Sequence, residues 1–206
     1  LALGSGEVTL YEMVRAFSVF PRDGTLPKLR FTKALPAVAQ RGKTALTSVD
    51  LQTDGGVRVY KADTTRIICD FLSDKSARSL GFGHAKVFDT PYPCIFKTGT
   101  SNQFQNIIAL GATSECTAGV WLGNFEGETV IRQTGSSIPA AIVRDLLDTL
   151  TKQKGAHEFL PPQSFTKQSI CVLSGMRATP DCPAVTQEYI SDDTSSVAKE
   201  NSTLKT

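Results

Sequence analysis

The chain has 206 residues, enough to bury a hydrophobic core and form one domain with an appendage. Its 40% hydrophobic and 20% charged content is ordinary for a globular protein, and its formal charge of +2 gives no indication of nucleic-acid binding. No apolar run approaches the roughly 20 residues that span a bilayer. The first residue is Leu1 rather than Met, and we expect the chain to be a piece of a larger protein.

The first 24 residues predict a turn followed by a helix that ends at Pro21. Thr9 and Glu12 have the spacing of a capping box, in which a hydroxyl and a carboxylate accept free main-chain N–H groups. The apolar positions that follow have helical spacing and predict one buried stripe: Leu10, Met13, Val14 and Phe17.

The next segments alternate between irregular and regular patterns. Residues 25–43 contain two prolines and predict irregular structure, and residues 44–60 predict a hairpin with arms Ala45–Leu51 and Val57–Tyr60. A helix is expected to follow, with Asp63 as its cap. Its predicted core residues are Ile67, Ile68, Phe71 and Leu72. Residues 73–90 predict a loop because they contain Gly81-Phe82-Gly83.

Three strands and a closing helix are predicted next. The strands are Ile95–Ser101, Ile107–Ala112 and Thr117–Asn124, and their short links favour an antiparallel meander. Ser136 and Ser137 suit the start of a long helix with an apolar face. That face comprises Ile142, Val143, Leu146, Leu147 and Leu150. We expect this helix to lie across the sheet.

After Gly155 the composition changes. Residues 1–155 are predicted to form one domain, residues 156–190 an appendage and residues 191–206, which are strongly polar, a disordered or linker tail. Cys171 and Cys182 frame a turn-rich stretch with little core of its own, so a disulfide between them is expected in an oxidising compartment.

The other three cysteines are interpreted as structural. Cys69 lies in a helical apolar pattern and should fill the core, whereas Cys94 and Cys116 flank predicted strands. The sequence has no C-x-x-C pair and only isolated histidines, so we expect neither a metal site nor a cofactor.

The stretch Ile95–Ser101 carries the clearest chemical signal. Two apolar residues anchor it, and Lys97-Thr98-Gly99-Thr100-Ser101 then supplies a cation, hydroxyl groups and a glycine. This combination suits an anion such as a carboxylate, because Gly99 lets a ligand approach the main chain. The alternative interpretation is an exposed strand end in which the lysine points outward and the glycine marks a bulge.

A Lys-Thr-Gly strand is chemically informative when an S-x-x-K nucleophile motif faces it. Matches occur at Ser164–Lys167 in the proline-rich appendage and in the polar tail, as at Ser196–Lys199. In such sites the serine begins a buried helix, and no match precedes an apolar helical pattern. We therefore interpret these matches as accidental.

Several ordered motifs together resemble class A, bifunctional penicillin-binding proteins. The segment Ala2–Leu10 is similar to A-L-G-x-x-E-V-T-L, and Ala62–Leu72 with the Ala77-Arg78 that follows also matches. Lys97–Ser101 and Gly119–Asn124 continue in the same order. The appendage, with Cys171, Ser174-Gly175 and Cys182, resembles the region after the transpeptidase domain in proteins of the 1C type. The resemblance covers residues 1–190.

The resemblance implies an α/β (α+β) fold of the serine β-lactamase and transpeptidase type, in which helices cover an antiparallel sheet. This chain would be its C-terminal half, incomplete at the N-terminal side, with the nucleophilic serine upstream. Lys97 would act as a catalytic residue. Thr98, Gly99, Thr100 and Ser101 would bind substrate, with the Thr100 N–H as one oxyanion donor.

The resemblance also implies the setting of the parent protein. Its partners would be D-Ala-D-Ala stem peptides of peptidoglycan and β-lactams. It would work at the periplasmic, extracytoplasmic face of a bacterial inner membrane and would carry a membrane anchor and a glycosyltransferase domain. One departure favours the alternative of an inactive module that binds cell-wall peptides or partner synthases. The family has Arg-Asp-Ala-Trp where this chain has Gln105-Asn106-Ile107-Ile108.

Overall fold

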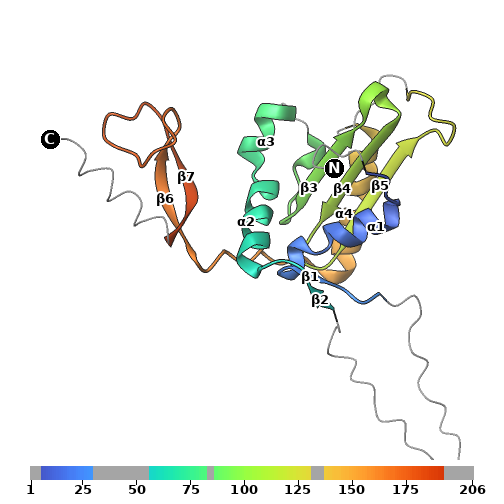
Figure 1. Ribbon diagram of the computed structural model, residues 1–206, viewed down its shortest axis with the longest axis horizontal. Coiled ribbons are helices and arrows are strands. Elements are labelled where there is room, and N and C mark those ends of the chain that lie inside the picture. The colour runs from blue at the N-terminus through green and yellow to red at the C-terminus, as the bar shows by residue number, and fades with distance from the viewer. Residues whose placement is uncertain (1–5, 30–55, 83–85, 131–136, 193–206) are drawn as a thin grey trace, which may run out of the picture.

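The computed structural model describes residues 6–29, 56–82, 86–130 and 137–192, without the side chains of residues 79–82 (Figure 1). Its helices are α1 (Leu10–Phe17), α2 (Ala62–Ser73), α3 (Lys75–Phe82) and α4 (Ile138–Lys154), with short 3-10 turns η1 (Phe20–Arg22), η2 (Lys86–Phe88) and η3 (Asn102–Phe104). Its strands are β1 (Thr25–Leu26), β2 (Val57–Arg58), β3 (Ile95–Thr100), β4 (Asn106–Ala112), β5 (Thr117–Gly123), β6 (Phe165–Cys171) and β7 (Val185–Ser191).

The predicted three-stranded meander is present at the centre of the fold. Strands β3, β4 and β5 pair in that order, and each pair is antiparallel. The register places Gly99 opposite Ile108, and Ile108 opposite Trp121. In the turn before β4, Gln103 and Phe104 both have positive φ, a conformation that few non-glycine residues adopt. Strands β3 and β5 are the two edges of this sheet within the described chain.

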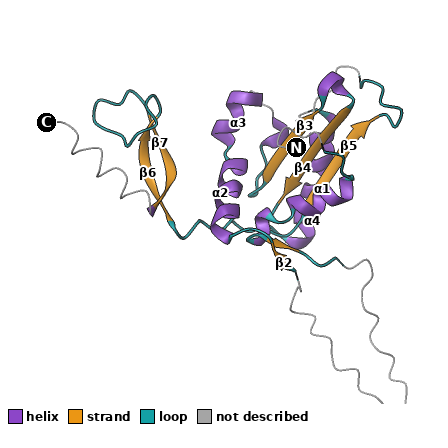
Figure 2. Cartoon of the chain, in the orientation of Figure 1, coloured by secondary structure: helices purple, strands orange, loops and turns teal. Residues whose placement is uncertain are grey.

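Helices cover both faces of the sheet, as Figure 2 shows. On one face, Phe96 and Ala109 pack with Val143 and Leu147 of α4 in a buried cluster. On the other face, Ile95 and Leu110 pack with Phe17 and Cys69, and Met13 of α1 lies against them. The alternation of side chains along β3 and β4 therefore fills two separate cores.

The start of α1 and the buried thiol of α2 were predicted correctly. The Thr9 hydroxyl accepts the Glu12 N–H at 3.2 Å, and the Glu12 carboxylate accepts the Thr9 N–H at 2.9 Å, which completes a capping box. Cys69 is buried in the core, and this burial raises the pKa of its thiol to about 12.

One prediction about α2 was wrong and another held only in part. Asp63 lies inside the first turn, and the N-cap is Lys61, which makes no side-chain capping bond. Of the predicted core residues Leu72 packs against the core, but the buried residues of α2 are Thr65 and Cys69, and Phe71 is 56% exposed. The helix thus turns a more polar stripe inward than its apolar residues indicate, because β3 and η1 approach it from the side of Cys69.

The predicted loop over residues 73–90 is also corrected. Helix α3 spans Lys75–Phe82, and the Asp74 carboxylate accepts the N–H groups of Ser76 and Ala77 at 2.7 and 3.1 Å. Asp74 is therefore a helix cap that the glycine pair further along the chain obscured in the sequence.

Residues 25–43 were predicted to be irregular, but Thr25–Leu26 forms a short strand. Val57–Arg58, predicted as part of a hairpin with Ala45–Leu51, pairs antiparallel with Thr25–Leu26. The first predicted arm of that hairpin lies outside the described residues.

A bidentate ion pair joins α2 to the turn after α1. Arg66 donates from Nε and Nη2 to the two carboxylate oxygens of Asp23, each at 2.9 Å. Hydrogen bonding from Arg66 holds the pKa of the Asp23 carboxyl below its ordinary value. The planar fork of the guanidinium explains why both bonds form at once.

Replacing Asp23 with Asn is expected to reduce the free energy of unfolding by about 1 kcal/mol or less near neutral pH, since the carboxylate is partly screened by water. A carboxyl group with a lowered folded-state pKa stabilises above its unfolded pKa, near 3.9, and that stability is lost as pH falls through the folded pKa. Urea unfolding is measured near neutral pH and again in acid, below the folded-state pKa of Asp23. The difference in free energy of unfolding between wild type and Asp23→Asn should be smaller in acid. Asp145→Asn, an exposed α4 carboxylate, is the control; an equal loss there would contradict the role of the pair.

The segment after α4 forms a separate hairpin. Strands β6 and β7 pair antiparallel with each other and lie beyond α2, on the side away from the central sheet (Figure 1). The linker before β6 is held to α2, because the Asp63 carboxylate accepts the N–H groups of Gln163 and Ser164 at 2.8 and 2.9 Å. No helix of the described part combines the length and the hydrophobicity that crossing a membrane requires.

Candidate functional site

The Lys-Thr-Gly stretch lies at the free edge of the central sheet. Ile95 and Phe96 begin β3 and are buried in opposite cores, which fixes the strand on both sides. From Lys97 onward the strand emerges, and Lys97 and Thr100 are exposed whereas Thr98 and Gly99 are half-buried. The sequence change from apolar to polar residues therefore coincides with the point where β3 leaves the core.

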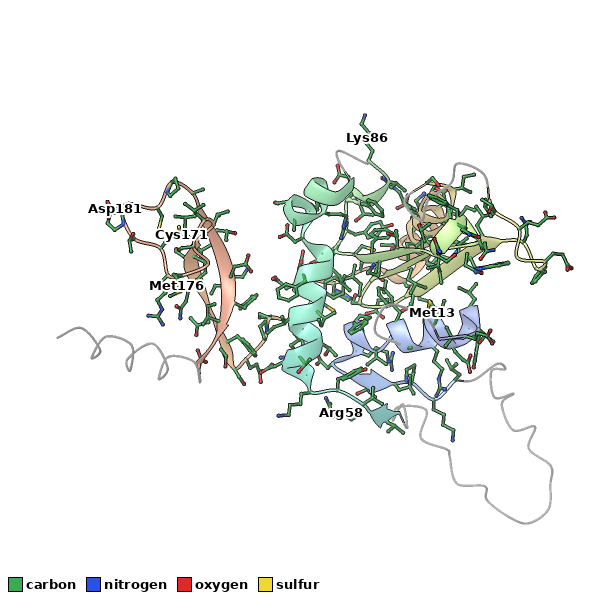
Figure 3. The ribbon with its side chains drawn as sticks, turned by 45° about the horizontal axis from the view of Figure 1, so that its top comes forward. Met13, Arg58, Lys86, Cys171, Met176 and Asp181 are labelled. Carbon is green, nitrogen blue, oxygen red and sulfur yellow. The ribbon has the colours of Figure 1, made fainter. Side chains whose placement is uncertain are left out.

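A groove of about 710 Å³ opens along this end of β3. Its sheet side is formed by β3, β4 and β5, and its other wall by α1 and the segment before it. Met13 of α1 lies beneath the sheet on this side (Figure 3). The lining residues are Gly6, Glu7, Val8, Leu10, Met13, Lys97, Thr98, Gly99, Thr100, Ser101, Asn106, Ile108, Leu110 and Trp121. The groove thus brings together all five residues predicted for the site.

Strict alternation places Lys97 and Thr98 on opposite faces of β3, which conflicts with a shared role. The edge position of the strand removes the conflict. Both residues line the groove, and both also line a smaller cavity of about 270 Å³ between β3 and helices α2 and α3. One ligand lying along the rim of β3 could therefore contact both.

The Lys97 ammonium has no carboxylate partner among the described residues. Its Nζ donates to the carbonyl oxygen of Thr98 at 2.6 Å and remains exposed to water. An ammonium group has three donors, so two remain for a bound anion. Glu7, the acidic residue of the groove lining, lies on the α1 side. The groove is therefore lined by separate positive and negative groups.

Glycine at position 99 is required by the space in the groove wall. A β-carbon there would lie 2.9 Å from Cγ2 of Ile108, closer than side chains normally approach. Because Gly99 faces the groove, the missing side chain also leaves the main chain of β3 accessible to a ligand.

Behind β3, Arg78 of α3 lines the smaller cavity and contacts two of the aromatic rings in its wall. Its guanidinium lies 5.3 Å from the ring centre of Phe88 and 5.5 Å from that of Phe96, and it donates to the carbonyl groups of Leu72 and Phe88. Burial lowers the pKa of Arg78 from its ordinary value, although an arginine this basic stays charged. Arg78 therefore positions Phe96, the residue directly before Lys97.

Asn106, one of the residues at which this sequence departs from the family that it resembles, has a defined structural role. Asn106 accepts the indole N–H of Trp121 through Oδ1 at 2.9 Å, and its own N–H donates to the Ser101 hydroxyl at 2.8 Å. The Trp121 ring lies 5.4 Å from that of the exposed Phe125. Ser101 is thus engaged in closing the β3–β4 turn as well as lining the groove.

Nine of the groove residues were not predicted for the site, and those among them with an ionic, amide or aromatic side chain are Glu7, Asn106 and Trp121. Trp121 gave the best available signal, because it is the single tryptophan and lies in a predicted strand. Its face could not be assigned without the register that places it opposite Ile108.

The structure also locates the other candidates. Ser164 precedes strand β6 rather than a helix, which agrees with treating its S-x-x-K match as accidental, and Ser196–Lys199 lies outside the described residues. Cys171 and Cys182 come together at the loop end of the β6–β7 hairpin, as two free thiols. Within the described segments, no group of three or more histidine, cysteine or acidic side chains could hold a metal ion.

Comparison with known proteins identifies relatives of one kind. The chain is 24% identical to penicillin-binding protein 1A of Clostridium perfringens, over 84% of this chain and 20% of that protein. It is also 24% identical to penicillin-binding protein 1C of Escherichia coli K12, over 85% of this chain and 20% of that protein. The chain therefore spans about a fifth of the length of these relatives. No family model matches the chain.

A solved structure agrees with the sequence comparison. The crystal structure of penicillin-binding protein 1A from Haemophilus influenzae superposes with a TM-score of 0.70 and covers 93% of this chain, at 18% identity and over 33% of that protein. The likeness extends over helices and sheet alike and confirms the predicted α/β fold, an antiparallel sheet covered by helices. The chain is thus similar in sequence to penicillin-binding proteins 1A and 1C, and it has the fold of the matched part of penicillin-binding protein 1A.

Proposed function

We propose that this chain forms the substrate-carboxylate wall of a serine-type DD-transpeptidase that cross-links peptidoglycan stem peptides. The observation that carries the proposal is the groove at the edge of the sheet. Lys97, Thr98, Gly99 and Thr100 line it together, and the Lys97 ammonium has no carboxylate partner among the described residues. The relationship to penicillin-binding proteins supplies the reaction class.

In this proposal the residues of β3 have separate roles. Lys97 and Thr98 bind the terminal carboxylate of a D-Ala-D-Ala stem peptide or of a β-lactam, by charge and by a hydroxyl donor. Lys97 also adjusts the proton network of the nucleophile. Gly99 admits the substrate main chain, and the N–H of Thr100 stabilises the oxyanion of the tetrahedral intermediate. Ser101 keeps the turn closed and borders the groove.

The nucleophile is assigned to the parent protein, in a part of its sequence upstream of this chain. There, a serine that begins a buried helix would attack the D-Ala-D-Ala carbonyl and form an acyl-enzyme, which an amine of a second stem peptide resolves. The parent would be anchored at the extracytoplasmic face of the bacterial inner membrane and would carry a glycosyltransferase domain. The reaction needs no cofactor, because both half-reactions are acyl transfers.

A second candidate function is a non-catalytic module that binds cell-wall peptides or partner synthases. The observation that favours it is the Ser101–Asn106–Trp121 hydrogen-bonded chain beside the groove. Where the resemblance of the sequence implies a charged pair, this chain has the neutral residues Gln105 and Asn106, and Asn106 is hydrogen-bonded within the fold. Such a module would keep the carboxylate site of β3 and lose turnover.

Labelling of the full-length parent with a fluorescent penicillin separates the two functions. A transpeptidase should form a covalent adduct that survives denaturing electrophoresis, since the acyl-serine bond is covalent. The 206-residue chain alone should form no adduct, because its S-x-x-K matches are accidental. The test uses conditions that label a known penicillin-binding protein. If the parent forms no adduct under them, the transpeptidase function is contradicted and the binding module is favoured.

A further inference from the structure

Two thiols meet at the loop end of the β6–β7 hairpin, away from the groove. Cys171 is the last residue of β6 and is 4% exposed, whereas Cys182 lies in the connecting loop and is half-buried. Their side chains interact directly. Figure 3 shows Cys171 at the end of the strand pair, with Met176 and Asp181 on the loop that returns past it.

Main-chain bonds hold the loop that joins the two cysteines in a fixed shape. The Cys171 N–H donates to the Met176 carbonyl, and the Gly175 N–H donates to the Cys171 carbonyl, each at 2.8 Å. The Val172 N–H donates to the Ala184 carbonyl at 3.0 Å, and so joins the two sides of the loop. These bonds fix the main chain of the loop that carries the two thiols.

Each sulfur also has its own hydrogen-bond donors. The Thr179 N–H donates to Sγ of Cys182 at 3.2 Å. Hydrogen bonds from the Ser174 side chain, from the Cys182 thiol and from the Ser174 main chain lower the pKa of Cys171 to about 7. A thiol with this pKa is about half ionised at pH 7, and the thiolate is the form that attacks disulfides.

The hairpin has a physical need for a covalent link. A two-stranded sheet alone is marginally stable in water, and β6 and β7 pair only with each other among the described strands. At the loop end, Val172 and Leu173 are 60% and 82% exposed, so apolar burial contributes little there. Closing the loop would reduce the conformational freedom of the open hairpin.

We propose that Cys171 and Cys182 are a thiol pair that is oxidised to a disulfide by a protein or small-molecule disulfide. The half-buried Cys182 thiol passes its proton to Cys171 and attacks the oxidant as a thiolate, which forms a mixed disulfide and releases the first oxidant sulfur as a thiolate. The shielded Cys171 then gives that proton to the released thiolate, attacks Sγ of Cys182 to form the Cys171–Cys182 bond and releases the second oxidant sulfur. The two cysteines lose two protons and two electrons, and the oxidant disulfide gains them.

The test exposes the reduced full chain to oxidised glutathione at neutral pH and follows the intact mass. The expected product has lost the mass of two hydrogen atoms, and digestion should give one linked peptide that contains both Cys171 and Cys182. Cys171→Ser should stop at a glutathione adduct on Cys182. Cys116→Ser, which removes a half-buried thiol whose pKa is raised by burial, should link as the wild type does.

Hydrogen exchange supplies a readout that does not depend on the chemistry of the oxidant. Oxidation should slow exchange of the Cys171, Val172 and Gly175 amides by tenfold or more, on the order expected for closing a short loop. A glutathione adduct that persists on wild-type Cys182, a linkage to Cys69, Cys94 or Cys116, or unchanged exchange after oxidation would overturn the proposal.

Discussion

Replacement of Lys97 by Ala in the full-length parent should slow acylation by penicillin on the order of a hundredfold or more, as loss of one electrostatic contact in such sites does. Lys97 is the cation at the β3 end of the groove, and its ammonium has no carboxylate partner within the described residues. Its loss leaves the ligand carboxylate without its ionic partner in the groove. The rate of fluorescent-penicillin labelling under pseudo-first-order conditions measures the effect.

The matched control is Lys86→Ala. Lys86 begins η2, and its exposed side chain points into solvent away from the groove (Figure 3). Lys86→Ala removes the same charge as Lys97→Ala, so any effect of net charge appears in both variants. Equal labelling of wild type and Lys97→Ala would show that β3 is not the carboxylate wall. That result would not decide whether the parent is a transpeptidase. Labelling of the wild-type parent decides that question.

The second large effect is expected in helix α4, where Leu147→Ala should reduce the free energy of unfolding by about 2–5 kcal/mol. Leu147 is 0% exposed and packs with Phe96 and Val143 behind the sheet. It also lies where a β-carbon on Gly111 would come within 2.9 Å of its Cδ1, so the site is tightly packed. The midpoint of urea unfolding of the 206-residue chain is the measurement.

The neighbouring residue provides the control for the same substitution. Leu146 is 44% exposed, so Leu146→Ala should change the free energy of unfolding by less than about 0.5–1 kcal/mol. Both variants lose the same side-chain atoms and gain the same helix propensity. Equal destabilisation by the two variants would contradict the assignment of the buried face.

That pair of leucines also shows where periodicity was insufficient. Helical spacing predicts Ile142 and Leu146 on the buried face of α4 together with Val143 and Leu147, but Ile142 and Leu146 are 42% and 44% exposed. The apolar stripe of α4 is wider than the strip that β4 and β5 can cover. Spacing along a helix cannot show where the contact with a sheet ends.

A similar limit applies to α2 and α3. Local signals can locate helix ends. Asp74 has the residue type of a cap at the start of α3, but the glycines that follow it favoured a loop. Asp63, by contrast, has the sequence of a cap but binds the linker N–H groups of Gln163 and Ser164, which lie a hundred residues away. Only long-range contact could reveal that use of its carboxylate.

The sequence by itself determined the meander of β3, β4 and β5, because short links and apolar runs leave few other pairings. It also located the Lys97–Ser101 stretch, since a change from apolar to polar residues marks where a strand leaves the core. Tertiary structure decided the rest of the groove. It brought Glu7 and Trp121 into the same groove as Lys97, and gave Lys97 and Thr98 a common rim at a sheet edge. These relations depend on register and on helix packing, which join residues that no local pattern connects.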